Sequence, residues 1–345
     1  MQTNIAVLVP AYNEAKVIRR SLFSCFAAGV KRSDIYVVDD GSHDNSADIA
    51  EHYRVNVLRK ANAGKALALE SGMKHFELDK HYTHVLILDA DSSLSAEYLP
   101  AMHAAIAAHP DAVLFSSVQQ SEQPARWNCL TAYRAMEYTV YGGITRESQH
   151  LLKTIQIVPG PGSLFRSDVF ANIRFHDLTL IEDIEWTCIL QRQGLGDKIY
   201  YVPEAVVFTQ DPVTLRDYCG QLTRWNRGIW QVVKRYKLGR GKQRIDVQWL
   251  YVLLQQCVLS PLYLMLIPFW LWVAPVAQMW CLGVDLAILF VFAALTAVRQ
   301  RRWDVVVMFP TFFVLRCLGW FLFIQAGLLE RRAAETKWYQ VPRYN

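Results

Sequence analysis

The stretch Val85-Leu-Ile-Leu-Asp-Ala-Asp91 joins an apolar run to two carboxylates that stand one residue apart. The run lacks the polar alternation of a half-exposed strand, so it predicts a strand that is buried on both faces. Similar runs occupy residues 5–9, 35–38, 55–58 and 112–116, and helical candidates lie between them at 14–28, 46–52, 65–76 and 96–108. This βα alternation predicts a doubly wound α/β domain with a mostly parallel sheet.

Polar residues follow three of the predicted strands directly. Tyr12-Asn-Glu14 comes after the first strand, Asp39-Asp-Gly-Ser42 after the second, and Asp89-Ala-Asp91 after the fourth. Ligands of such sheets bind beyond the carboxyl ends of the strands. We therefore expect these residues to meet at one edge of the sheet and to form a binding site there.

Asp89 and Asp91 are candidates for holding a divalent cation. Carboxylates with this spacing at a strand end can share Mg²⁺ or Mn²⁺ and leave positions for diphosphate oxygens. Taken alone, the pair is explained as well by loop carboxylates that cap the next helix. The other polar clusters at the same predicted edge favour the metal site.

The two neighbouring clusters are ambiguous when each is taken alone. Asp39 could accept hydrogen bonds from a uracil imide or from ribose hydroxyls, although Asp, Gly and Ser are also ordinary turn residues. Asn62-Ala-Gly-Lys65 opens a helix, where backbone N–H groups and a lysine suit a phosphate. A simple turn with a solvated lysine is an equally good reading, and the spacing is not that of a P-loop.

Glu182-Asp183 stands before another helical stretch. Transfer of a sugar with inversion needs one base to take the proton of the acceptor hydroxyl, and a carboxylate can do this. Asp183 is the candidate base, and spacing alone leaves Glu182 open. Carboxylates at a helix start also serve as plain caps.

Gln221, Arg224 and Trp225 lie at positions i, i+3 and i+4, so a helix would place them on one face. A guanidinium suits phosphate, an amide suits hydroxyls, and an indole can stack on a sugar ring. The alternative is an amphipathic helix at a membrane surface with Trp as its anchor. Pro159-Gly-Pro-Gly162 predicts a turn that brings backbone close to another group.

The second part of the chain is a predicted membrane region. Residues 247–298 contain a single charge, Asp285, and can hold two crossings with a turn near 275–278, while 305–329 offers a third. Arg316 within the third segment either faces a partner or snorkels to the interface. The Lys and Arg clusters flank these segments, which indicates cytoplasmic membrane flanks and argues against nucleic-acid binding. Seven scattered cysteines without a Cys-x-x-Cys pair argue against zinc and disulfides.

Seven ordered motifs resemble the membrane-integrated family 2 glycosyltransferases, which include cellulose, chitin, hyaluronan and poly-N-acetylglucosamine synthases. The motifs are Val9-Pro-Ala-Tyr-Asn-Glu14, Asp39-Asp-Gly-Ser42, Asn62-Ala-Gly-Lys-Ala66, Asp89-Ala-Asp91, Gly160-Pro-Gly-Ser163, Glu182-Asp183 and Gln221-Leu-Thr-Arg-Trp225. The final Trp338-Tyr-Gln-Val-Pro-Arg343 is similar to the C-terminal tail of the poly-N-acetylglucosamine synthases. The resemblance implies a GT-A-like fold followed by interfacial helices and a helical membrane region.

The resemblance also implies roles for single residues. Tyr12, Glu14, Asp39, Lys65 and Asp89 would bind the nucleotide sugar, Asp89 and Asp91 the metal ion, and Asp183 would be the catalytic base. Gly160, Gly162, Ser163, Gln221, Arg224 and Trp225 would bind the acceptor and the diphosphate. The relatives often carry Cys where this chain has Gly162, which predicts a different acceptor preference.

We therefore expect an inverting β-glycosyltransferase that uses a UDP-sugar, UDP-N-acetylglucosamine by resemblance, with Mg²⁺ or Mn²⁺ to elongate a polysaccharide. The alternatives are transfer of one sugar to a lipid, and an inactive assembly or receptor component with the same fold. The expected ranges are a cytoplasmic catalytic domain at 1–230, a basic interfacial linker at 231–246, a multi-pass region in the inner membrane at 247–329 and a cytoplasmic tail at 330–345. The small membrane part predicts a partner subunit or a homo-oligomer for export.

Overall fold

The computed structural model describes residues 3–124, 126–174, 179–331 and 342–343. These residues form two compact units. The sheet unit comprises the described residues of Met1–Gln120, Arg146–Gln210 and Arg343–Asn345, and the helical unit those of Ser121–Thr145 and Asp211–Pro342. These units differ from the linear ranges expected from the sequence, because residues 121–145 and 211–230 pack with the C-terminal helices.

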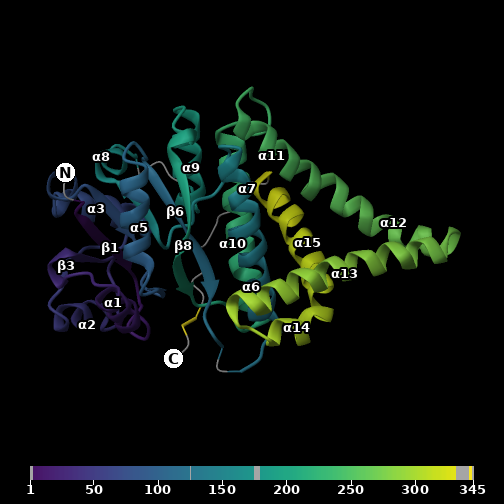
Figure 1. Cartoon of the computed structure of the whole chain (residues 1–345), viewed down its shortest axis with the longest axis horizontal. Helices are drawn as coiled ribbons and strands as arrows, with labels where there is room; N and C mark the ends of the chain where they lie inside the picture. The colour runs from purple at the N-terminus through teal and green to yellow at the C-terminus, as the bar shows by residue number, and fades with distance from the viewer. Residues whose placement is uncertain (1–2, 125, 175–178, 332–341, 344–345) are drawn as a thin grey trace. The chain divides into compact units, whose positions relative to one another are not determined.

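The first half of the sheet unit follows the predicted βα alternation. Strands β1 (Ile5–Ala11), β2 (Ile35–Asp39), β3 (Asn56–Arg59) and β4 (His84–Ile87) pair in parallel in the order β3-β2-β1-β4. The connecting helices include α1 (Ile18–Ala27), α2 (Ser46–His52), α3 (Lys65–His75) and α4 (Leu78–His81), and α5 (Tyr98–Ala108) follows β4 (Figure 1). The predicted α/β architecture is therefore confirmed for this half.

The second half of the sheet is antiparallel, so the sheet is mixed. Strand β7 (Ser163–Arg166) pairs antiparallel with β4 and with β6 (Leu114–Ser121), and β5 (Ser92–Leu94) pairs antiparallel with β8 (Ile199–Thr209). The complete order is β3-β2-β1-β4-β7-β6-β8-β5. The expectation of a mostly parallel sheet therefore needs correction to a mixed sheet.

Both faces of strand β1 are buried, as its uninterrupted apolar sequence predicts. Val7 and Val9 belong to the core under α1 and α5, whereas Ala6 and Leu8 belong to the core on the other face. The second core also contains Trp186 of helix α9 (Glu182–Arg192). Shorter helices, α7 (Arg146–Leu151) and α8 (Ser167–Ala171), complete this unit, with single turns at Arg32–Asp34 and Gly196–Lys198.

The helical unit has a core of its own. It begins with α6 (Cys129–Glu137), which continues as a π-helical segment at Tyr138–Thr145, and α10 (Leu215–Arg235). The others are α11 (Arg244–Leu254), Gln255–Leu259, α12 (Ser260–Val273), α13 (Pro275–Gln300), α14 (Asp304–Met308), Phe309–Thr311 and α15 (Phe312–Arg331). Side chains of α6, such as Leu130 and Tyr133, pack with Leu289 and Phe312.

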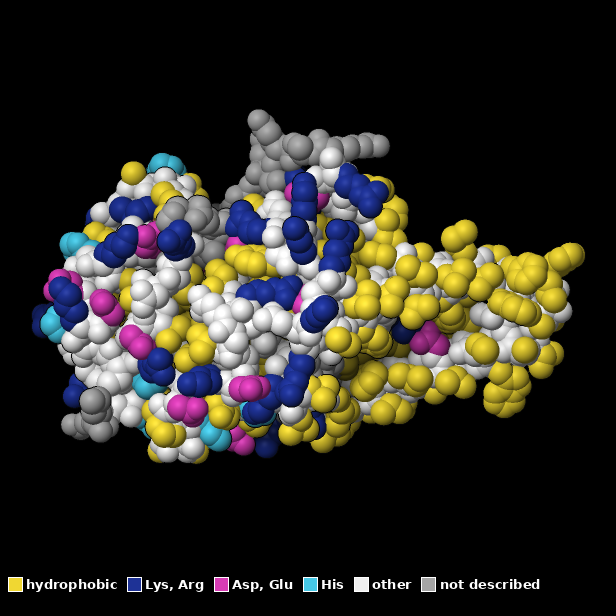
Figure 2. Space-filling view, turned by 90° about the horizontal axis from the view of Figure 1, so that it is seen from above, with side chains coloured by type: hydrophobic (Ala, Val, Ile, Leu, Met, Phe, Trp, Pro, Cys, Tyr) yellow, Lys and Arg dark blue, Asp and Glu magenta, His cyan; other side chains and the backbone are white. Residues whose placement is uncertain are grey.

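Three segments of the helical unit are long and apolar enough to cross a membrane. They are Arg244–Val273, Pro275–Gln300 and Asp304–Arg331, and they agree with the predicted segments and the turn near 275. Helices α12 and α13 present mainly hydrophobic side chains on the face seen in Figure 2. Exposed hydrophobic residues of these helices include Met265, Trp272 and Trp280, which are 75%, 83% and 73% exposed. Such a surface is stable in hydrocarbon and unfavourable in water.

Helix α15 packs closely along α10 in the helical unit. The Trp230 indole Nε1 donates a hydrogen bond of 3.0 Å to the Phe323 carbonyl, and Arg227 Nε lies 2.5 Å from Glu330 Oε1. Gly327 faces the same indole, and a Cβ there would lie 2.7 Å from its ring. This glycine therefore permits the two helices to approach each other.

Two charged residues from the interior of the membrane segments, Asp285 and Arg316, form a polar cluster with Tyr263. Arg316 Nη1 of α15 lies 2.9 Å from Asp285 Oδ1 of α13, a second contact joins Nη2 to Oδ2, and the Tyr263 hydroxyl donates to Oδ2 at 3.2 Å. The predicted partner of Arg316 is therefore present and is Asp285, whereas snorkelling to the interface stays a prediction. A charge among apolar helices is costly when it lacks a partner.

We expect the substitution Arg316→Leu to lower the thermal stability of the detergent-solubilised protein. It leaves Asp285 without its cation, at a cost of roughly 2–4 kcal/mol, because removal of one member of a buried pair strands the other charge. The double substitution Arg316→Leu with Asp285→Leu is the matched control and should recover most of the loss. Equal melting temperatures of the single variant and the unaltered protein would contradict this expectation.

Candidate functional site

The loops after β1 and β2 are tied to each other by side-chain hydrogen bonds. The Asn13 N–H donates to Ser42 Oγ at 2.9 Å, the Glu14 N–H donates to Ser46 Oγ at 2.7 Å, and the His43 N–H donates to Asn13 Oδ1 at 2.8 Å. Asn13 has the positive φ of 56° that asparagine tolerates well. The clusters that follow the first two strands therefore do meet at one edge of the sheet.

Asp39 and Asp40 have different surroundings at the end of β2. Asp40 accepts hydrogen bonds from the Ala63 and Gly64 N–H groups, at 3.0 and 2.7 Å, and pairs with Lys60 at 2.5 Å. Asp39 is buried, and its Oδ1 has no hydrogen-bond partner among the described residues. Asp40 therefore fixes the loop before α3, whereas Asp39 offers an acceptor atom to a ligand.

Lys65 links the end of β4 to the start of α9. Its ammonium nitrogen lies 2.7 Å from Asp89 Oδ1 and 2.7 Å from Glu182 Oε1. The residue is the first of helix α3, as its position after Asn62-Ala-Gly predicts. The sequence left Glu182 open as a base, but here its carboxylate is buried and paired with a cation.

Asp183 is half-buried at the first turn of α9. Its Oδ2 accepts a hydrogen bond from the Gly160 N–H at 3.3 Å, and its Oδ1 accepts one from the Ile184 N–H at 2.8 Å. Burial and the neighbouring Glu182 carboxylate raise the pKa of Asp183 to about 6. A carboxylate with this pKa is ionised near neutral pH and remains basic enough to accept a proton.

Close approaches fix the loop that contains Gly160, Gly162 and Ser163. A Cβ at Gly160 would lie 2.9 Å from the Lys65 ammonium nitrogen. Gly162 has a φ of 80°, and a Cβ there would collide with Ser117 Oγ. Ser163 is fully buried, and its hydroxyl bonds the Pro159 carbonyl. Gly160 therefore lies beside Lys65 and its carboxylate partners. The acceptor contacts of Gly162 and Ser163 stay predictions.

Arg343, from the end of the chain, joins two of the predicted site residues. Its Nε and Nη2 each lie 2.7 Å from the Glu14 carboxylate oxygens, and its Nη1 lies 2.6 Å from Asp91 Oδ2. A planar guanidinium matches a carboxylate in this two-point manner. Residues 338–341 of the predicted tail motif lie outside the described part of the chain. The tail motif pointed to Arg343, but only the fold reveals its partners.

The donor set at this edge suits a hard divalent cation. Two of the protein's own cations, Lys65 and Arg343, already lie on the carboxylates of Glu14, Asp89 and Asp91. Within residues 3–331 and 342–343 as described, no three Asp, Glu, His or Cys side chains are grouped to hold a metal ion. Mg²⁺ and Mn²⁺ sites commonly use one or two carboxylates and complete the shell with water and substrate phosphates. The residues therefore fit such an ion only together with a phosphate ligand.

The remaining predicted residues lie on helix α10 of the helical unit. Gln221, Arg224 and Trp225 belong to one continuous helix, and their spacing places them on one face of it, as predicted. Gln221 Oε1 accepts a hydrogen bond from Arg134 Nη2 at 3.2 Å, and the Arg134 guanidinium carbon lies 4.9 Å from the centre of the Trp225 ring. No sequence motif surrounds Arg134, so its contacts with Gln221 and Trp225 can be found only from the folded structure.

Comparison with known proteins agrees with these observations. Residues 3–228 match the family described as "Glycosyltransferase like family 2". Poly-beta-1,6-N-acetyl-D-glucosamine synthase of Staphylococcus epidermidis is 26% identical over 275 residues, which are 74% of this chain and 64% of that protein. The enzyme of the same name from Staphylococcus aureus (strain COL) is 27% identical over 268 residues, or 72% and 63%. The chain thus spans less than two thirds of the length of these relatives.

A solved structure shows the same fold over nearly the whole chain. Mannosyltransferase PcManGT from Pyrobaculum calidifontis, in complex with GDP-Man and Mn²⁺, has a TM-score of 0.63 and 18% identity, and the match covers 97% of this chain and 89% of that one. The resemblance to family 2 glycosyltransferases and the GT-A-like fold class, both expected from the sequence, are confirmed. With the family match over more than half of its length, the chain belongs to glycosyltransferase family 2.

Proposed function

We propose that this glycosyltransferase is an inverting β-transferase that elongates a polysaccharide from a UDP-sugar, UDP-N-acetylglucosamine in the first instance. The observation that carries the proposal is the half-buried carboxylate of Asp183 beside Gly160, Lys65 and Glu182. The candidate base Asp183, in α9, and Lys65, in α3, whose ammonium can bind a diphosphate, therefore lie close to each other. The relatives named above support the sugar and the polymer product.

The sheet unit supplies the residues for the donor in this proposal. Asp39 Oδ1 is a buried acceptor suited to a uracil imide or a ribose hydroxyl. Tyr12 and Glu14 follow β1 at the same edge, where they bind the nucleotide, and Lys65 binds the diphosphate. Release of Lys65 from Asp89 and Glu182 toward phosphate oxygens keeps its charge balanced.

The chemical step needs one proton transfer and one displacement at carbon. The Asp183 carboxylate takes the proton of the acceptor hydroxyl as the oxygen forms its bond to C1 of the donor sugar. The bond from C1 to the β-phosphate oxygen breaks with inversion, and its electron pair leaves on UDP. Asp89 and Asp91 would hold Mg²⁺ or Mn²⁺, which offsets the negative charge of the leaving diphosphate when it is bound.

The helical unit supplies the acceptor residues and the membrane attachment. In this proposal Gln221, Arg224 and Trp225 bind the acceptor and the diphosphate, and the same role is proposed for Gly160, Gly162 and Ser163 from their motif. Carbohydrate binding commonly combines an aromatic ring for the sugar face with polar groups for its hydroxyls. A membrane partner subunit or a second copy completes the path for export.

Two full crossings agree best with the contacts of the chain. Arg343 belongs to the sheet unit, so both ends of the membrane region lie on one side of the bilayer, which requires an even number of crossings. Helix α15 packs along the amphipathic helix α10 and is the segment that does not cross. In this proposal the protein lies in the inner membrane, and its sheet unit faces the cytoplasm.

The second candidate function is transfer of a single sugar to a lipid acceptor. The small membrane region favours it, because two crossings give little material for a polymer channel. An inactive assembly component is the third candidate, and the intact carboxylate cluster argues against it.

Purified protein in detergent or nanodiscs separates these candidates. The protein is incubated with a panel of UDP-sugars and GDP-mannose, with Mg²⁺ or Mn²⁺, and both nucleotide release and product size are measured. We expect a ladder or a high polymer from UDP-N-acetylglucosamine. A single organic-soluble product would establish the lipid candidate, and no nucleotide release with any donor would overturn an enzymatic function.

The ion pairs of Arg343 lead to a prediction about metal binding. Because its guanidinium occupies a carboxylate oxygen of Asp91, the substitution Arg343→Ala should tighten Mn²⁺ binding in the presence of UDP by roughly tenfold, which equals about 1.4 kcal/mol. Electron paramagnetic resonance of free Mn²⁺ measures this affinity directly. The control Lys31→Ala removes an exposed charge elsewhere in the sheet unit and should leave it unchanged. Unchanged Mn²⁺ affinity in Arg343→Ala would refute the competition.

A further inference from the structure

Arg134 is a buried arginine in the helical unit to which the transfer scheme above gives no role. It lies in α6 with its side chain 5% exposed. Its guanidinium carbon is 4.9 Å from the centre of the Trp225 ring and 5.1 Å from the centre of the Tyr218 ring. Cation–aromatic contacts of this kind hold both the cation and the rings in place, more strongly when they are shielded from water.

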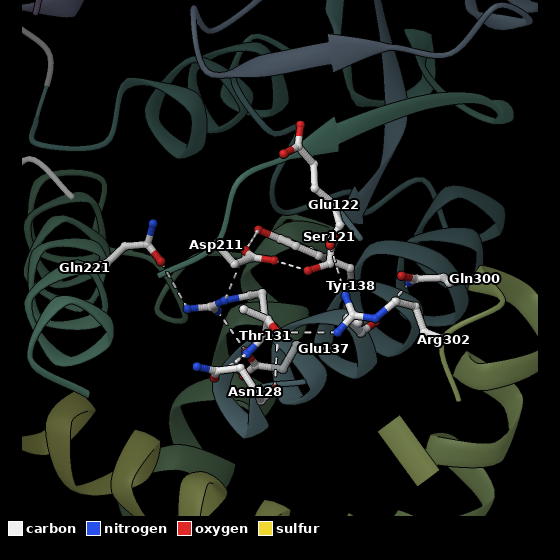
Figure 3. Close-up of polar contacts among 12 residues, drawn as sticks. Ser121, Glu122, Asn128, Thr131, Glu137, Tyr138, Asp211, Gln221, Gln300 and Arg302 are labelled. Atoms are coloured by element: carbon white, nitrogen blue, oxygen red, sulfur yellow. Dashed lines mark hydrogen bonds and ion pairs between the residues drawn. The ribbon is translucent and has the colours of Figure 1, made fainter. Parts of the chain in front are cut away.

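The polar atoms of Arg134 connect α6 to α10. Nη1 donates to Glu137 Oε2 at 2.8 Å within α6, and Nη2 donates to Gln221 Oε1 at 3.2 Å across to α10. The carbonyl end of the Gln221 amide is therefore held by the arginine. Its NH₂ end points away from this contact, as Figure 3 shows for the labelled side chain.

The buried carboxylate of Asp211 and the half-buried carboxylate of Glu137 surround the arginine. Asp211 Oδ1 lies 3.9 Å from Arg134 Nε, and the Asp211 carboxylate accepts hydrogen bonds from Tyr138, at 3.1 Å, and from Ser121 (Figure 3). Burial raises the pKa of Asp211 to about 6 and also raises the pKa of Glu137. A buried cation with such partners has one orientation, because every alternative leaves a charge unpaired.

We infer that Arg134 is a positioning residue that sets the orientation of Gln221 and Trp225 for the acceptor. Since the Gln221 oxygen is engaged, this amide presents N–H donors, so it recognises a lone pair of an acceptor hydroxyl or ring oxygen. The Trp225 ring, held against the guanidinium on one side, keeps its other side for the apolar face of a sugar. The inference rests on the proposed function, in which Gln221 and Trp225 bind the acceptor.

A merely structural role for Arg134 makes a different prediction. Loss of packing would lower stability and would affect donor and acceptor alike, with no dependence on Gln221. A positioning role raises the KM for the acceptor selectively. It also makes the effects of Arg134 and Gln221 substitutions non-additive, because both remove the same interaction.

The test is a double-mutant cycle with Arg134→Lys and Gln221→Ala in the full-length protein. The lysine keeps the charge but lacks the planar fork that reaches both Glu137 and Gln221. The acceptor probe is a short oligomer of N-acetylglucosamine, with UDP-N-acetylglucosamine as donor. We expect each single substitution to raise the KM for the oligomer roughly tenfold, to change the KM for the donor less than twofold, and the double variant to resemble the single ones.

Two further variants keep the experiment interpretable if Arg134→Lys folds poorly. Gln221→Glu retains an oxygen for Arg134 but loses the outward donor, so it should weaken oligomer binding. Arg216→Lys changes an exposed arginine of α10 and is the matched control. Additive effects in the cycle, or normal oligomer binding by Gln221→Glu, would overturn the inference. Failure of the proposed function is distinct, because the unaltered protein would then transfer no sugar to the oligomer.

Discussion

Replacement of Asp183 with Asn is expected to lower the rate of sugar transfer by about 10³-fold and to leave UDP binding within twofold of the unaltered protein. General-base catalysis by one positioned side chain contributes on this scale, and an amide cannot accept the proton. The amide has nearly the same size and shape as the carboxylate, and its one oxygen can keep the hydrogen bond from either the Gly160 or the Ile184 N–H while the other bond is lost. The measurements are initial rates of UDP release and calorimetric titration with UDP.

The matched control and the pH profile distinguish a base from a structural carboxylate. Asp168→Asn removes an exposed carboxylate of the same unit, 65% exposed and paired with Arg166, and should leave the rate unchanged. Asp183 acts in its ionised form, and burial has raised its pKa to about 6. The rate should therefore fall about tenfold per pH unit below pH 6 and level off above it. Retained turnover in Asp183→Asn would remove this residue from the mechanism.

Removal of divalent metal is expected to have the second-largest effect. Treatment with EDTA should abolish transfer, and added Mn²⁺ or Mg²⁺ should restore it, because a nucleoside diphosphate is a poor leaving group when its charge is not offset. In Asp91→Asn, we expect the metal concentration that gives half-maximal activity to rise more than about 100-fold, since a ligand carboxylate becomes neutral.

A binding measurement gives this prediction a second readout. Electron paramagnetic resonance should show weaker Mn²⁺ binding by Asp91→Asn in the presence of UDP, whereas Asp48→Asn, an exposed carboxylate of α2, should bind as the unaltered protein does. Full activity in EDTA would contradict a metal-dependent mechanism. In that case Lys65, which already lies between two carboxylates, becomes the main cation for the diphosphate.

The parallel half of the sheet could be predicted because its information is local. The apolar run at 85–88 and its counterparts are complete within a few residues, and a strand buried on both faces needs no alternation. Strands β5, β7 and β8 escaped prediction, because antiparallel pairing such as Val85 with Phe165 depends on contacts far apart in the sequence. The membrane segments were predicted well, since length and hydropathy suffice for them.

The candidate site divides in the same way. Asp89, Asp91 and Asp183 could be selected from residue type and position after a strand or before a helix. Their ion-pair partners could not, because the contact of Arg343 with Glu14 joins residues 329 positions apart. Arg134 carries no sequence signal, since an arginine within an ordinary helix is usually exposed.

The family, the α/β alternation, the membrane segments and the carboxylates at the strand ends can all be identified from the amino-acid sequence, because short runs of neighbouring residues are enough to recognise each of them. The pairing of cations with carboxylates, in contrast, follows from the three-dimensional fold. The fold pairs Lys65 with Asp89 and Glu182, Arg343 with Glu14 and Asp91, and Arg316 with Asp285. The physical reason is that burial makes an unpaired charge costly, and the partner that relieves the cost can come from any part of the folded chain.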